Sequence, residues 1–185
     1  MKLLAMKVVR FEAGEISVYG RGMVLVPAET ILEFQESLES ELGRQEAERI
    51  ILRIGENLTG KSTKRYIDKR KDLRPIFKKV TTGDPSIEMG REIFKMSGLG
   101  DIQILEVTKD ADKFVVGTKN SPLAKEHLRT RGKSRAPVCH FLTGIIRGVL
   151  KASKDAEYSA VETRCLAMGN SDECVFEFRK RNQSA

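Results

Sequence analysis

The sequence predicts an α+β fold with a mainly antiparallel sheet. The first observation is the order of the expected elements: two strands and three helices, then a hairpin, a helix and a closing hairpin. The second is a change of apolar period, from three-and-four spacing over 31–58 to alternation over 102–116. The third is size, because 185 residues with 40% hydrophobic and 32% charged content suit one domain with a substantial core. We therefore expect a single domain over residues 1–185.

The N-terminal segment is expected to form a pair of short strands within residues 1–26. The loose alternation of apolar residues breaks at Gly14 and again at Gly20–Gly22, as turns would require. The opening residues Met1–Lys7 are too short in apolar length for a signal peptide. No apolar run approaches the roughly 18 residues that cross a bilayer. We expect a cytoplasmic protein without a membrane segment.

Two helices are expected next. Pro27 suits a first helical turn, and Thr30 with Glu33 matches a capping box. The apolar stripe of this helix is Ile31, Phe34, Leu38 and Leu42, and Gly43 ends it. The following helix covers about 45–68, with an apolar stripe of Ala47, Ile50, Ile51, Ile54 and Leu58.

Two glycines, Gly55 and Gly60, lie inside this longer helix, where each costs about 1 kcal/mol relative to alanine. They indicate close approach of another backbone, or a break near Gly60. A third helix is expected over 87–97, ended by Gly98.

From Gly100 onward the pattern is that of strands. Residues 102–116 predict a β-hairpin, and residues 123–128 a helical turn. Pro137 begins a helix that runs to about Ala152. Two closing strands, 157–166 and 173–180, are joined by a Gly-Asn-Ser-Asp turn.

The charge is concentrated. The net charge is +7, and Lys61–Lys79 carries nine basic residues against Asp68 and Asp72, an excess of 9 − 2 = +7. A second basic cluster lies within 129–135. Such segments attract phosphates, nucleic acid or an acidic partner. The alternative is a solvated helix and loop, which the scarcity of stacking aromatic residues in this segment favours.

The three cysteines, Cys139, Cys165 and Cys174, lie in the last third of the chain with Glu162. Thiolates and a carboxylate can close a tetrahedral zinc site. An odd number of cysteines argues against a disulfide framework, so the alternative is three buried thiols that act as small hydrophobic groups.

Strand geometry puts one condition on the zinc hypothesis. A hairpin across Met168–Asp172 brings Cys165 close to Cys174. Glu162, however, lies three residues before Cys165 and would face the opposite side of a regular strand. Both reach one metal only if a bulge lies between them. His140 is the alternative ligand in place of Glu162.

The chain resembles the vinyl-4-reductase domain, a hydrocarbon-binding or small-molecule-binding domain. The resemblance spans about residues 15–180. The residues that carry it are V-C-H-F-L-T-G-I-I-R-G from Val138, E-T-R-C-L-A-M-G-N-S-D-E-C-V-F-E-F from Glu162, Asn120-Ser121-Pro122-x-Ala124 and Gly22–Pro27. It implies helices on one side of an antiparallel sheet, as in nitric-oxide sensors and vesicle-tethering subunits of the Golgi transport complex. It also implies a pocket for an apolar ligand and a homodimer.

In aromatic-sensing bacterial activators that contain this domain, three cysteines and a glutamate hold zinc. The resemblance places that set on Cys139, Glu162, Cys165 and Cys174. This chain has no tryptophan, which argues against a phenol pocket with a tryptophan donor. It also lacks a recognisable ATPase domain or helix-turn-helix, so we do not expect it to be such an activator itself.

Three functions follow as hypotheses. The first is a stand-alone sensor or carrier of an apolar small molecule, with a structural zinc ion and a regulatory protein partner. Its pocket would lie between the helix faces at 50–58 and 87–96 and the hairpin at 102–116. The second is a tetrapyrrole vinyl-reductase or accessory enzyme, although the chain has no dinucleotide fingerprint to supply hydride. The third is nucleic-acid or protein binding through Lys61–Lys79.

Overall fold

The computed structural model describes residues 9–18, 21–69, 91, 94–95 and 97–181. Its centre is a four-stranded antiparallel sheet in the order β4-β5-β7-β6. The closing hairpin therefore pairs with the earlier hairpin through β5 and β7. The strands are β4 (Asp101–Val107), β5 (Lys113–Lys119), β6 (Tyr158–Arg164) and β7 (Glu173–Lys180).

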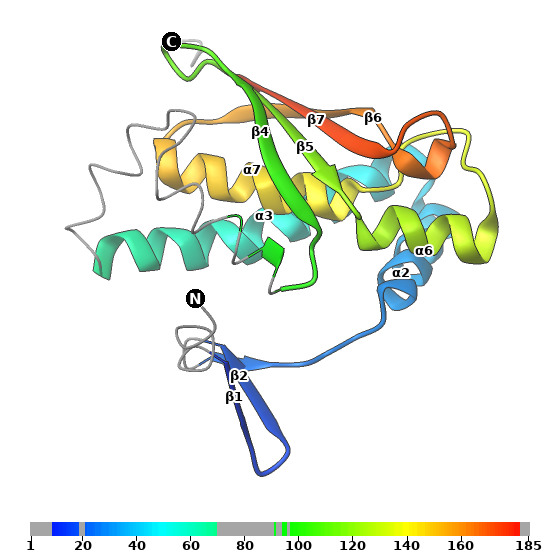
Figure 1. Cartoon of the computed structure of the whole chain (residues 1–185), viewed down its shortest axis with the longest axis horizontal. Coiled ribbons are helices and arrows are strands. Elements are labelled where there is room, and N and C mark those ends of the chain that lie inside the picture. The colour runs from blue at the N-terminus through cyan, green and yellow to red at the C-terminus, as the bar shows by residue number, and fades with distance from the viewer. Residues whose placement is uncertain (1–8, 19–20, 70–90, 92–93, 96, 182–185) are drawn as a thin grey trace.

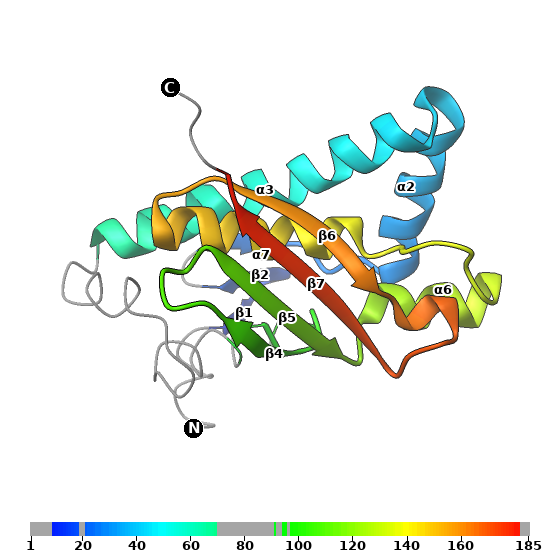
Figure 2. The ribbon, with the colours of Figure 1, turned by 90° about the horizontal axis from the view of Figure 1, so that it is seen from above.

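The helices lie on one side of this sheet. Figures 1 and 2 show α7 directly beneath the strands and α3 beyond it, with α2 and α6 together at one end. The arrangement confirms the predicted α+β fold with an antiparallel sheet. The helices are α2 (Ala28–Leu42), α3 (Arg44–Lys69), α6 (Pro122–Arg131) and α7 (His140–Lys154).

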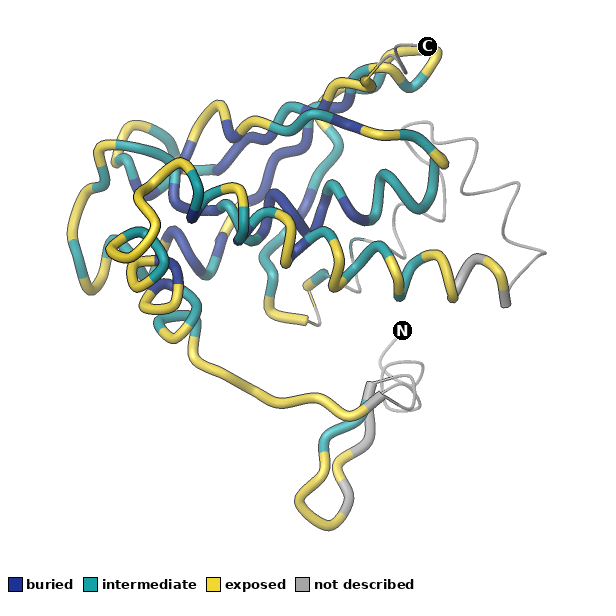
Figure 3. The backbone as a smooth tube through the Cα atoms, turned by 180° about the vertical axis from the view of Figure 1, so that it is seen from behind, coloured by how far each residue is buried: buried dark blue, intermediate teal, exposed yellow. Residues whose placement is uncertain are grey.

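The core lies between the sheet and α7. Phe114, Phe176 and Phe178 lie on the inner strands, are fully buried and belong to the same core cluster as Leu142 and Ile146 of this helix. Tyr158 packs edge-on against Phe114 with ring centroids 5.8 Å apart. Figure 3 shows the same distribution, with buried segments concentrated in the strands and in α7.

Helices α3 and α7 cross with almost no side chain between them. A Cβ atom added at Gly55 would overlap the Phe141 carbonyl oxygen, and one added at Gly144 would overlap the Leu52 carbonyl oxygen. Thr59 Oγ1 donates a 2.8 Å hydrogen bond to the Ile145 carbonyl across the same contact. The close backbone approach predicted from Gly55 is confirmed, and α3 continues through Gly60 without a break.

The N-terminal segment forms three strands rather than the predicted two. They are β1 (Val9–Glu12), β2 (Glu15–Val18) and β3 (Arg21–Met23), paired as an antiparallel meander. The expected break at Gly20–Gly22 is wrong in part, because Arg21 and Gly22 pair with β2. We call residues 9–26 the N-terminal arm; it lies apart from the main body in Figures 1 and 3.

Helix α2 presents a different face to the core than predicted. Leu32 and Gln35 are buried, whereas Phe34 and Leu42 are about half exposed at 51% and 49%. The capping-box prediction is also wrong, because Pro27 is the N-cap residue and makes no side-chain cap. The helix sits between α3 and α6, so contacts on both flanks, and not the widest apolar stripe, orient it.

Two other helix boundaries differ from the prediction. The expected helical turn at 123–128 is the ten-residue helix α6, which Ser121 caps by accepting a hydrogen bond from the Ala124 N–H. Helix α7 begins at His140 and not at Pro137, because the Cys139 N–H donates to a side chain of β6 and its carbonyl accepts the first helical bond.

Part of the predicted organisation lies outside the described residues. Of the expected helix over 87–97, Arg91, Phe94 and Lys95 are described and helical. Of the basic segment Lys61–Lys79, the part up to Lys69 closes α3 and the rest lies outside the description. Across the described helices, none combines the length and apolar character that a bilayer span requires.

Candidate metal centre

The four predicted site residues come together in the core. One potential ligand atom from each of Cys139, Glu162, Cys165 and Cys174 lies within 4.8 Å of all the others, and all four residues are buried. Three segments supply them. Cys139 is the N-cap of α7, Glu162 and Cys165 belong to β6 and the residue that follows it, and Cys174 lies in β7. This buried Cys3Glu cluster can hold a metal ion.

The bulge that the zinc hypothesis required is present in β6. Glu162 pairs with Phe176, but Arg164 pairs with Val175, so Thr163 is the extra residue on this strand. Tyr158 and Glu162 are the buried residues on the regular part of the strand, four positions apart and so on one face. The extra residue resets the alternation, so Cys165 returns to the side that Glu162 faces.

The sulfur spacing suits a tetrahedral site. Cys139 Sγ lies 3.7 Å from Cys174 Sγ, which lies 3.9 Å from Cys165 Sγ. Zinc–sulfur bonds of about 2.3 Å at tetrahedral angles separate two sulfurs by about 3.8 Å. These two sulfur–sulfur distances are therefore already the ones that a metal between the thiols would impose.

Glu162 is the member of the cluster whose hydrogen bonding is incomplete. Its Oε2 accepts a 2.9 Å bond from the Cys139 N–H. Its Oε1 is buried and, among the residues described, has no hydrogen-bond partner. A buried oxygen without a partner costs about 1–3 kcal/mol, and a bound cation would satisfy it.

The electrostatics of the cluster also favour a cation. Burial, with Cys165 beside it, raises the pKa of Glu162 to about 9. Hydrogen bonds from Cys139 and Cys165 lower the pKa of Cys174 to about 5. The cluster without a metal thus holds one thiolate next to groups that resist ionisation. A metal ion reverses that resistance, because a coordinating thiol loses its proton outright.

Two neighbours of the cluster carried no signal as such in the sequence. Ser121 Oγ lies 3.3 Å from Cys139 Sγ, and the Leu166 N–H donates a 3.3 Å bond to Cys174 Sγ. The sequence indicated Ser121 only as part of the segment that ends a hairpin. A backbone donor has no sequence signal at all. Both groups support sulfur atoms that carry negative charge.

His140, the alternative ligand, is directed elsewhere. Its Nε2 lies 3.4 Å from Glu48 Oε1 on α3, and it is not a member of the four-residue cluster. The structure therefore groups Glu162 with the cysteines and places His140 in the α3–α7 contact.

Comparison with known proteins identifies the region that contains the cluster. Residues 121–180 match the model of the vinyl-4-reductase domain, and all four residues of the cluster lie inside the match. No protein with a curated description matches the sequence.

Three solved structures share the fold. The phenol-responsive sensory domain of the transcription activator PoxR, with phenol, has a TM-score of 0.72 at 20% identity, covering 97% of this chain and 87% of that one. A trafficking protein particle complex subunit 3 from Naegleria fowleri, covalently bound to palmitic acid, scores 0.56 at 14% identity, covering 84% and 95%. A vinyl-4-reductase family protein from Methanocaldococcus jannaschii scores 0.52 at 20% identity, covering 86% and 85%.

At these identities the three structures show the fold alone, which includes the likeness to trafficking-complex subunits that the resemblance implied. The sequence match over 121–180 identifies the family. Through that region, which holds β7, β6, α7 and the Cys3Glu cluster, the chain belongs to the vinyl-4-reductase domain family.

Proposed function

We propose that this chain is a small-molecule sensor or carrier module with a structural zinc ion at Cys139, Glu162, Cys165 and Cys174. The observation that carries the proposal is the convergence of four buried donors from α7, β6 and β7 within 4.8 Å of one another. Three soft thiolates with one carboxylate favour zinc over magnesium or calcium, which take oxygen ligands.

The role proposed for the metal is structural. Four protein ligands complete a tetrahedral shell and leave no position open for water or substrate. The ligands tie the start of α7 to both strands of the closing hairpin. The metal would therefore hold together the part of the core that the sheet and α7 share, and its affinity would contribute directly to folding.

The ligand proposed for the module is an apolar small molecule. Two proteins with the same fold have phenol and palmitic acid in their structures, and both compounds are largely apolar. The proposed pocket lies between α3, the segment that contains Phe94 and the hairpin β4–β5. Ile54 and Leu58 of α3 support this position, because they are apolar yet 40% and 55% exposed.

We also propose that the module is a homodimer. The N-terminal arm, which includes the segment that leads into α2, exposes large apolar side chains, and three strands of three or four residues have little independent stability. A second copy of the chain would bury this surface. The exposed residues are Phe11, Met23, Val24, Leu25 and Val26, at 71%, 48%, 82%, 77% and 54%.

Native mass spectrometry of the protein as purified tests these proposals together. We expect two chains, one zinc ion per chain and a co-purified apolar compound. Cys165→Ala should lose the zinc and lower the melting temperature, whereas Val116→Ala, which truncates a buried residue that is no ligand, should lower the melting temperature and keep the zinc. Unchanged metal content in Cys165→Ala would remove the zinc proposal while leaving the ligand proposal standing.

A further inference from the structure

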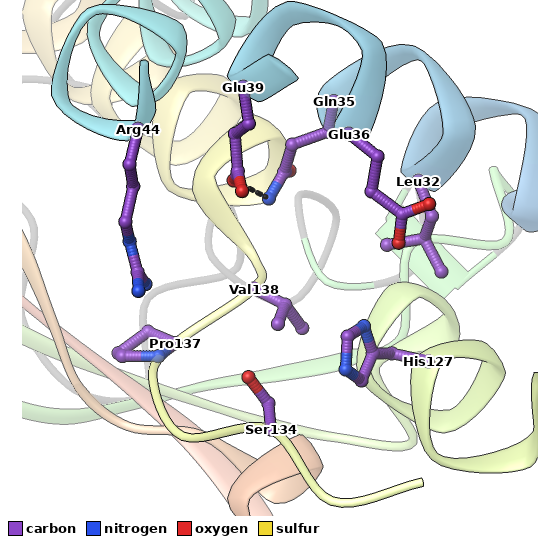
Figure 4. A pocket seen from close by; sticks show the side chains of 9 residues that line it. All are labelled: Leu32, Gln35, Glu36, Glu39, Arg44, His127, Ser134, Pro137 and Val138. Carbon is purple, nitrogen blue, oxygen red and sulfur yellow. Dashed lines mark hydrogen bonds between the residues drawn. The ribbon is translucent and has the colours of Figure 1, made fainter. Parts of the chain in front are cut away.

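A polar cavity lies at the end of the molecule where α2 meets α6. It has a volume of about 110 Å³ and lies between α2, α6 and the segment that leads into α7. Figure 4 shows side chains from all three converging on it. One water needs only about 10–15 Å³ of such space, so the cavity admits a molecule of several non-hydrogen atoms. It is separate from the apolar site proposed above and does not depend on it.

One wall of the cavity carries a buried acceptor without a partner. Gln35 is 5% exposed, and its Nε2 donates to Glu39 Oε1 at 3.4 Å. Its Oε1 has no hydrogen-bond partner among the described residues. The amide orientation follows from Glu39, because the flipped form would place two oxygens together. In Figure 4 both side chains point from α2 into the cavity.

The charges around the cavity leave this wall negative. Glu36 is paired with Arg131, and Arg44 at the rim pairs with Glu48 at 2.7 Å. Glu39 makes no ion pair within 4 Å anywhere in the described part of the chain. It is therefore the carboxylate at this cavity that has no cation paired with it.

The opposite side supplies no competing cation. Burial, with the charge of Arg131 near it, lowers the pKa of His127, so this imidazole is neutral near pH 7. Leu32 and Val138, both buried, form the apolar floor between the polar walls. The lining thus combines two acceptors, one unpaired negative charge and a small apolar surface.

We propose that this cavity binds a small organic ammonium ion. Its N–H groups donate to Gln35 Oε1 and to the Glu39 carboxylate, and its short alkyl chain packs on Leu32 and Val138. This occupant satisfies the unpartnered amide oxygen and neutralises Glu39 at the same time. A carboxylate ligand would be repelled by both acceptors, and a neutral alcohol would leave the charge of Glu39 unpaired.

The test is a titration of the full chain followed by amide NMR, with n-propylammonium as the probe. n-Propanol and propionate serve as the neutral and anionic comparisons at equal ionic strength. We expect saturable shifts at Gln35, Glu39 and Val138 with the ammonium ion only. Glu39→Gln keeps the shape and removes the charge, so the dissociation constant should rise about tenfold or more.

Glu41→Gln is the matched control, since it removes the same charge from an exposed position of the same helix that does not line the cavity. It should leave the dissociation constant unchanged. Gln35→Leu should weaken binding and leave Glu39 in place. Equal binding of n-propanol, equal effects of Glu39→Gln and Glu41→Gln, or shifts that never saturate would each overturn the proposal.

Discussion

The family-matched region, residues 121–180, and the N-terminal arm use apolar residues in opposite ways. In the family-matched region the apolar side chains of α7 and β7 share one core, with Phe176 and Phe178 at 0% exposure. In the arm, Val24 and Leu25 are more exposed than buried, at 82% and 77%. Apolar content alone therefore does not make a core. Burial also needs elements that are held against one another.

The family-matched region holds its elements together by two devices that the described part of the arm lacks. The first is the Cys3Glu cluster, which joins α7 to β6 and β7. The second is the glycine contact between α3 and α7, where backbones meet without intervening side chains. Both depend on particular atoms at particular places, so substitutions there test the comparison most directly.

The largest effect expected is that of metal removal. Structural zinc contributes on the order of 10 kcal/mol to the folding of small domains, a large fraction of a typical domain stability. Chelation of the purified protein should lower the melting temperature by about 10–20 °C. Calorimetry with and without chelator measures this, and re-addition of zinc should restore the transition. An unchanged melting temperature after verified metal loss would mean that the core packing alone holds the region.

The next effect expected is at the helix contact. In Gly144→Ala the new methyl group meets the Leu52 carbonyl oxygen, which cannot rotate away, and overpacking of this kind costs about 2–3 kcal/mol. Gly60→Ala is the control in the partner helix. A Cβ there lies 3.6 Å from the Gly148 carbonyl oxygen, an ordinary contact, so the protein should gain up to about 1 kcal/mol from helix propensity. Urea unfolding compares the two, and equal effects would contradict the close approach.

The candidate site was predictable from the sequence because its geometry depends on strand periodicity. The three-residue spacing of Glu162 and Cys165 required either a bulge or the loss of one ligand, and β6 has the bulge at Thr163. The supporting contacts could not be predicted in the same way. A backbone N–H such as that of Leu166 is present in almost every residue, and Ser121 comes near Cys139 only through the fold.

The face of α2 shows where the periodicity argument fails. Ile31 and Leu32 are adjacent apolar residues, and each begins a plausible stripe at three-and-four spacing. The stripe through Phe34 has more apolar members, but contacts with α3 and α6 turn the helix so that Leu32 and Gln35 are inside. A buried glutamine gives no signal of its own, and so the cavity it lines was not predicted.

A smaller effect is expected at the ion pairs beside the glycine contact. Glu56 of α3 pairs with Arg147 and with Lys151, which lies 3.1 Å away. Burial alone would raise the pKa of Glu56, but the hydrogen bond from Lys151 and the charge of Arg147 outweigh burial and lower it. Glu56→Gln should cost about 1–2 kcal/mol. Glu157→Gln, which removes the more exposed partner of Lys151, should cost less than about 0.5 kcal/mol, and urea unfolding compares the two variants.

The pH dependence of Glu56 has a definite sign. Because its pKa is lower in the folded protein than its ordinary value of 4.5, its stabilisation is present above that value and is lost as the pH falls through the folded pKa. Unfolding free energies measured between about pH 6 and pH 3 should therefore fall less steeply in Glu56→Gln than in the parent protein. Parallel curves would mean that Glu56 does not contribute to acid sensitivity.

The smallest effect on unfolding is expected in the arm. Val24→Asp with Leu25→Asp replaces exposed side chains that touch little of the core, so the unfolding free energy at high dilution should change by less than about 0.5 kcal/mol. The same double variant should abolish the proposed dimer, because two buried charges would oppose association. Sedimentation velocity measures this, with Val161→Asp as the control, since Val161 is 59% exposed on β6. If the double variant stays dimeric, or unfolds with a large loss of stability, the arm belongs to the core of its own chain and the contrast with the family-matched region does not hold.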